Sequence, residues 1–272
     1  MSQWNAMTYE GKDTILRVVR EEAERLFVLA EEPGAWDRPT ACTGWTARDV
    51  VGHIVDTTEG YFAAFDAARG KGEVPAPYGL PAMHERANEM AVAFRRIPQA
   101  EMMDRLRADF EKMMGILEPL GPDEWTGLMV THAYMGPVPA FFYAAGQLMD
   151  YGVHSWDIRQ GRGGAHGLSG DVADLLVPFM FAIWQGTVRT EAVEEPGEIG
   201  IRVVGGRNAG DFRVSVGEKG LTYEPGQIDE LPALIEFDAG SFVLTAFGRG
   251  NFGTVRGDFA AAERYLNLFF RI

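Results

Sequence analysis

Three residues of this chain could bind one metal ion together. Asp150 and His154 are four residues apart, so in a helix their side chains project from the same face. His53, far upstream, is the candidate third ligand. Two imidazoles and one carboxylate suit Zn, Ni or Fe, and three protein ligands leave a position open for water, a substrate or a thiol.

The spacing alone does not establish a metal site. Acid and histidine pairs four residues apart are common on solvated helix faces, and a single inward histidine is often a hydrogen-bonded core residue. The surroundings of Asp150 and His154 are mostly apolar, which predicts a largely buried helix. A buried carboxylate is costly unless it binds something, and this favours metal binding.

Two helices must position these side chains. The first begins at Thr46, with Asp49 in its first turn, and places His53 on a mainly apolar face. The second is expected to begin at Gly136-Pro137 and to end near Gly161. On the second helix, Asp157 could support a ligand imidazole or could face solvent beside Arg159.

Composition limits the class of protein. The chain has 272 residues and a net charge of -14, the wrong sign for neutralising phosphates, so nucleic acid is not an expected partner. No basic segment followed by an apolar run opens the chain, and no stretch approaches the roughly 20 apolar residues of a membrane span, so we expect a soluble, cytoplasmic protein without a membrane partner. The one cysteine, Cys42, excludes an internal disulfide and cysteine-rich metal sites. Cys42 precedes a helix start, but the sequence shows no base beside it.

The patterning predicts an α+β protein with two domains. Further helices are expected over Thr14–Ala30, Ala82–Phe94 and Pro98–Leu120, with a loop over Asp123–Met135 in which His132 is solvated or reaches the mouth of the bundle. After the glycine-rich segment 161–167, a helix over Asp171–Arg189 leads into short alternating segments typical of strands, and helices follow at Ser241–Phe247 and Phe259–Phe270. We therefore expect a four-helix bundle over residues 1–165 and a small α+β domain over residues 166–272.

Two segments resemble a known family. Pro39 to His53, PTACTGWTARDVVGH, is similar to the second-helix signature of the mycothiol-dependent maleylpyruvate isomerase family, within the DinB-like four-helix bundles. His154-Ser155-Trp156-Asp157 resembles its fourth-helix signature. The resemblance implies that His53, Asp150 and His154 are the metal ligands. In the isomerase the carboxylate is Glu, whereas Asp150 is one methylene shorter.

The C-terminal part resembles the lobe, similar to sterol carrier proteins, that follows such bundles. Phe247-Gly248-Arg249 and Val255-Arg256-Gly257-Asp258 match its Gly-Arg and Gly-Asp segments. In the isomerase an arginine of this lobe is thought to serve the substrate. The resemblance therefore implies a catalytic role for Arg249, with a solvated loop arginine as the alternative.

The resemblance implies an enzyme that uses mycothiol as a thiol cosubstrate. A divalent metal, with Zn expected before Ni or Fe, would activate the thiol for isomerisation or for transfer to a small electrophile. The alternative is a DinB-like metal-binding protein without thiol chemistry, either a hydrolase using metal-bound water or a carrier. An iron oxygenase fits the ligands but not the resemblance. We expect small-molecule partners and a monomer or homodimer.

Overall fold

The computed structural model describes residues 3–163 and 166–270. The chain divides into two compact units, Met1–Leu168 and Ser169–Ile272. The predicted domain boundary, between residues 165 and 166, adjoins residues 164–165, which lie outside the described residues.

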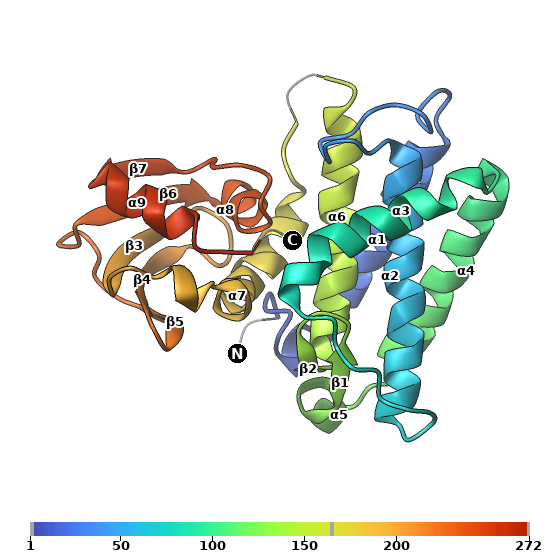
Figure 1. The fold of residues 1–272 in the computed structure, drawn as a ribbon, viewed down its shortest axis with the longest axis horizontal. Helices are drawn as coiled ribbons and strands as arrows, with labels where there is room; N and C mark the ends of the chain where they lie inside the picture. The colour runs from blue at the N-terminus through green and yellow to red at the C-terminus, as the bar shows by residue number, and fades with distance from the viewer. Residues whose placement is uncertain (1–2, 164–165, 271–272) are drawn as a thin grey trace. The chain divides into compact units, whose positions relative to one another are not determined.

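The first unit is a bundle of four long helices, as predicted (Figure 1). They are α1 (Lys12–Glu31), α2 (Ala47–Ala68), α4 (Gln99–Leu117) and α6 (Phe141–Gln160). Helix α1 packs on α6, and α2 packs on α4 and α6. In the core, Phe27, Phe110 and Tyr151 meet edge to face and join α1, α4 and α6. This packing fixes the inward face of α6, which carries the predicted metal ligands.

The segment between α4 and α6 differs from the prediction. The expected loop over Asp123–Met135 contains a helix, α5 (Pro122–Gly127), and a strand, β1 (Met129–His132). Strand β1 pairs antiparallel with β2 (Gly136–Pro139), so α6 begins at Phe141 and not at Gly136-Pro137. Each strand has only four residues and β2 contains two prolines, so neither shows the alternation that identifies a strand.

Short helices complete the first unit. They are η1 (Tyr9–Gly11), η2 (Leu80–Ala82), α3 (Met83–Ala93) and η3 (Phe94–Arg96). Helix α3 packs against α2, with the Ala91 carbonyl close to Gly52 in the second turn of α2. In the part of the chain that the structure describes, no helix is both long and apolar enough to cross a membrane.

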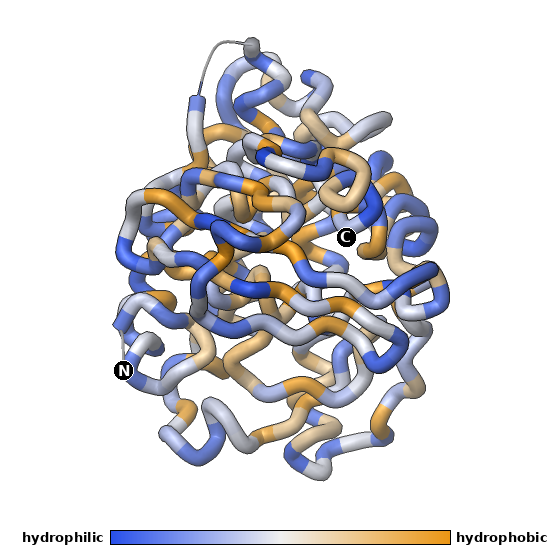
Figure 2. Tube along the Cα trace, turned by 90° about the vertical axis from the view of Figure 1, so that its left-hand side faces the viewer, coloured by the Kyte–Doolittle hydropathy of each residue, from blue (hydrophilic) through white to orange (hydrophobic). Residues whose placement is uncertain are grey.

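The second unit is a five-stranded sheet with helices, which confirms the predicted α+β class. Its elements are α7 (Gly170–Thr187), η4 (Thr190–Ala192), β3 (Gly197–Val204), β4 (Gly210–Gly217), β5 (Gly220–Pro225), β6 (Ala233–Asp238), α8 (Ala239–Ala246), β7 (Thr254–Gly257) and α9 (Phe259–Leu266). The strand order is β5-β4-β3-β6-β7; β3 and β6 are parallel, and the other neighbouring pairs are antiparallel. Hydrophilic and hydrophobic residues alternate along the strands in Figure 2, as expected of a sheet with one covered face. Phe181 of α7 packs on Phe212 and Tyr223 of that sheet.

The start of α2 is fixed by a buried carboxylate. Asp49 is fully buried, and its side chain accepts hydrogen bonds from the Thr46 backbone N–H at 2.8 Å and from Arg95 at 2.7 and 3.0 Å. Burial acts to raise the pKa of Asp49, but the hydrogen bonds from Arg95 and Thr46 outweigh it and lower the pKa. The predicted helix start at Thr46 is confirmed, and this cap sets the position of His53 one and a half turns later.

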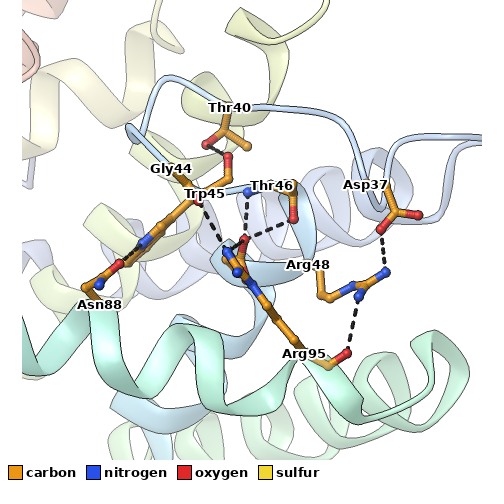
Figure 3. A network of polar contacts seen from close by, with 9 residues as sticks. Asp37, Thr40, Gly44, Trp45, Thr46, Arg48, Asn88 and Arg95 are labelled. Carbon is orange, nitrogen blue, oxygen red and sulfur yellow. Dashed lines mark hydrogen bonds and ion pairs between the residues drawn. The ribbon is translucent and has the colours of Figure 1, made fainter.

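Replacing Asp49 by alanine is expected to lower the free energy of unfolding by about 2 to 3 kcal/mol, because a helix cap and a buried partner of Arg95 are lost together. Asp37, which is largely exposed and pairs with Arg48 in the same network, is the matched control (Figure 3). Its replacement is expected to cost less than about 1 kcal/mol. Urea unfolding of both variants measures the difference, and equal losses would contradict the role given to Asp49.

Candidate metal centre

The three predicted ligands lie together inside the bundle. His53 comes from α2, and Asp150 and His154 come from α6. His53 Nε2 lies 4.0 Å from Asp150 Oδ1, and the candidate ligand atoms of all three residues are within 4.8 Å of one another. Asp150 and His154 are buried, whereas the His53 side chain is 19% exposed, so the site reaches the surface beside His53.

Asp150 lies in an environment where a bound cation would be favourable. Its Oδ2 atom is buried and has no hydrogen-bond partner among the residues that the structure describes. Burial raises the pKa of Asp150 to about 6, although the charge of His154 opposes this rise. A buried carboxylate with so little compensation is costly, and an ion held with the two imidazoles would offset that cost. The residues present therefore fit a divalent metal such as Zn.

Asp157 orients the His154 ring. Asp157 is fully buried, and its Oδ2 atom lies 2.8 Å from His154 Nδ1. Of the two interpretations of Asp157, the solvent-facing one is therefore wrong. A carboxylate on Nδ1 favours the proton on that nitrogen and leaves Nε2 to face the other ligands, the arrangement usual for metal-binding histidines. Burial lowers the pKa of His154, but the hydrogen bonds to Asp157 and Cys42 raise it by more, to about 9.

Cys42 lies beside His154 and Asp157, a contact that the sequence did not predict. Its Sγ atom is 3.3 Å from Asp157 Oδ2 and 4.0 Å from His154 Nδ1. The expectation that Cys42 has no base near it is therefore wrong. The Pro39–Thr46 loop brings the thiol there, because the Ala41 backbone N–H donates to the Asp157 carbonyl at 3.0 Å. Cys42 and His154 are 112 positions apart in the sequence, so no local pattern reveals this contact.

Trp45, at the end of the same loop, forms a wall of the site. Its ring centroid is 5.2 Å from that of His53 and 6.4 Å from that of His154. The indole Nε1–H donates to Asn88 of α3 at 3.0 Å (Figure 3). Trp45 was not predicted as a site residue, although it lies within the Pro39–His53 signature.

His132 and Arg249 are two further residues to which the sequence assigned a possible role. His132 is on β1 among aromatic rings that include Tyr61 and Phe142, and burial lowers its pKa to about 4, so it is neutral at neutral pH. Of the two expectations for His132, the solvated one is therefore wrong, and the contacts with Tyr61 of α2 and Phe142 of α6 fit the other, that it reaches the bundle. Arg249 belongs to the second unit, where its guanidinium lies 4.7 Å from the Phe247 ring centroid. Its catalytic role stays a prediction.

A helical bundle with two histidines and a carboxylate directed at one interior point is the architecture of a metal-binding bundle. Residues 19–159, more than half of the chain, match the family model described as the mycothiol maleylpyruvate isomerase N-terminal domain. The chain belongs to this family, and the predicted resemblance is confirmed.

Solved structures share the fold. The crystal structure of the mycothiol-dependent maleylpyruvate isomerase has 14% sequence identity and a TM-score of 0.58, and the match covers 89% of this chain and 90% of that one. The crystal structure of a histidine-to-alanine mutant of that isomerase gives the same values. No curated protein matches the sequence.

Proposed function

We propose that this protein is an enzyme in which a divalent metal, held by His53, Asp150 and His154, activates a low-molecular-weight thiol. Mycothiol is the thiol that the family and the similar isomerase support. The proposed reaction is an isomerisation, or a thiol transfer to a small electrophile. The observation that carries the proposal is the convergence of the three ligand atoms at a point that borders the partly exposed His53 side chain.

The surrounding side chains have separate roles in this proposal. When bound, the metal supplies a positive charge that lowers the pKa of a thiol ligand, so that it is a thiolate at neutral pH. Asp150 is the one carboxylate among the three ligands, so a divalent ion held there would keep a net positive charge and would attract an anionic thiolate. Asp157 holds the His154 ring, and the Trp45 indole, which lies against the His53 ring, provides an apolar wall beside the opening.

The test is thermal unfolding with and without metal. Mycothiol at about 100 times its dissociation constant should stabilise the metal-loaded protein by about 2.7 kcal/mol and raise Tm by roughly 5 to 10 °C. The metal-free protein should show no such shift in Tm, because the thiol then has no metal to bind. An unchanged Tm of the loaded protein at saturating mycothiol would contradict the proposal and leave a metal-binding protein without thiol chemistry.

Replacing Trp45 by alanine is expected to raise KM for the thiol by about tenfold or more, because the apolar wall beside His53 is lost. Metal content should stay unchanged, since Trp45 is not a ligand. Trp45→Phe keeps an aromatic wall and should restore most of the KM. Steady-state kinetics with parallel metal analysis separates these effects, and an unchanged KM in Trp45→Ala would show that the indole does not contact the thiol.

A further inference from the structure

A second set of ligand atoms lies on the other side of the His154 ring. Cys42 Sγ, His154 Nδ1 and Asp157 Oδ2 are all within 4.8 Å of one another. The separations are 2.8 Å from nitrogen to oxygen, 3.3 Å from sulfur to oxygen and 4.0 Å from sulfur to nitrogen. Atoms bound to one tetrahedral ion at about 2.0 to 2.3 Å are about 3.3 to 3.7 Å apart, so shifts of about half an ångström would let all three atoms bind one ion.

The backbone holds this set in place. The Ala41 N–H donates to the Asp157 carbonyl at 3.0 Å, which ties the Pro39–Thr46 loop to α6 next to Cys42. Within the loop, the Cys42 N–H donates to Thr40 Oγ1 at 3.2 Å, and the Cys42 carbonyl accepts from the Trp45 N–H at 2.9 Å. The thiol is thus positioned against α6 by its own main chain, which lowers the ordering cost of binding an ion.

We propose that Cys42, His154 and Asp157 form a second metal site, selective for thiophilic cations such as Cd²⁺, that shares His154 with the site described above. A thiolate ligand distinguishes it from the first set, which offers only nitrogen and oxygen. His154 contributes Nδ1 to the second site, whereas Nε2 is the nitrogen left for the first.

Because both sites use the His154 imidazole, we expect that a cation in one site prevents binding in the other. When a cation binds, the Cys42 thiol and His154 Nδ1 each lose a proton to solvent, and Nε2 keeps its proton. The protonated Nε2 has no lone pair for a second ion, so a cation at Cys42 removes a ligand from the His53, Asp150 and His154 set. This step rests on the proposed function, and it predicts that thiophilic cations inactivate the enzyme by evicting its metal.

The test uses the metal-free full-length chain titrated with Cd²⁺. Cys42 is the one cysteine of the sequence, so the ultraviolet thiolate-to-cadmium charge-transfer band reports on this residue alone. His53→Ala, which weakens the first site, should show the full band and bind one Cd²⁺. Cys42→Ser should lose the band and still bind one Cd²⁺ at the first site. The wild type should also bind one ion.

Three other results of the Cd²⁺ titration would contradict these expectations. No band in His53→Ala at saturating Cd²⁺, with its Tm unchanged, would overturn the second site and leave Cys42 as a hydrogen-bond partner of Asp157. Two ions in the wild type would overturn mutual exclusion. Failure of Cys42→Ser to bind any Cd²⁺, with the band intact in the other proteins, would overturn the first site, the proposed function and mutual exclusion, and would leave the Cys42 site supported.

Discussion

Replacing His154 by alanine is expected to leave the purified protein without bound divalent metal. His154 supplies one of the three ligand atoms that converge inside the bundle, and its ring is held by Asp157 at 2.8 Å. Removing a direct ligand should weaken Zn²⁺ binding by more than the roughly 10- to 100-fold that is typical when a supporting partner is lost. Equilibrium dialysis followed by elemental analysis measures the affinity.

Two further variants test whether the loss of metal in His154→Ala is due to the loss of a direct ligand. Asp157→Asn keeps the His154 imidazole but removes the negative charge of the carboxylate that contacts Nδ1, so it should weaken binding by the smaller amount, about 10- to 100-fold. His84→Ala removes an exposed histidine of α3 and should change nothing. His154→Ala with full metal content would show that the ligand assignment is wrong.

Replacing Asp150 by asparagine is expected to stabilise the metal-free protein while it abolishes tight metal binding. The folded state raises the pKa of Asp150 from 3.8 to about 6, chiefly through burial. Because the folded pKa is the higher one, the favourable contribution of the protonated carboxyl is present below pH 4 and is lost as the pH rises through 6. Above pH 7 the charged carboxylate therefore costs up to about 3 kcal/mol in the metal-free fold.

The asparagine side chain is close in size and carries no charge, so it removes that cost. Urea unfolding at pH 8 in the presence of a chelator should show Asp150→Asn to be more stable than the wild type, and the difference should vanish near pH 4. Saturating Zn²⁺ should reverse the order, because only the wild type gains binding energy. A metal-free Asp150→Asn protein that is less stable than the wild type at pH 8 would contradict the interpretation of Asp150 as an uncompensated buried charge.

The long elements and the ligand set could be predicted because each depends on a local pattern. Helical periodicity located α1, α2, α4 and α6, and strand alternation located β3 to β6. The inward faces of α2 and α6 then brought His53 and Asp150 within reach of each other, since both faces must pack in one core.

The missed features depend on contacts that no local pattern contains. The β1–β2 hairpin has strands of four residues, and the burial of His132 depends on rings that α2 and α6 bring to that hairpin. Cys42 and Trp45 lie in a loop whose path over α6 is set by a backbone hydrogen bond to Asp157. Backbone hydrogen bonds of this kind leave no signature in residue type, so the sequence showed a cysteine without a base and did not show the wall beside His53.

Anomalous X-ray diffraction from crystals of the Zn²⁺-loaded protein, recorded at the zinc absorption edge, tests the central claim most directly. It should show a peak about 2.0 to 2.2 Å from His53 Nε2, an Asp150 carboxylate oxygen and His154 Nε2. A peak that leaves out any of these three atoms, or no peak inside the bundle at saturating Zn²⁺, would contradict it.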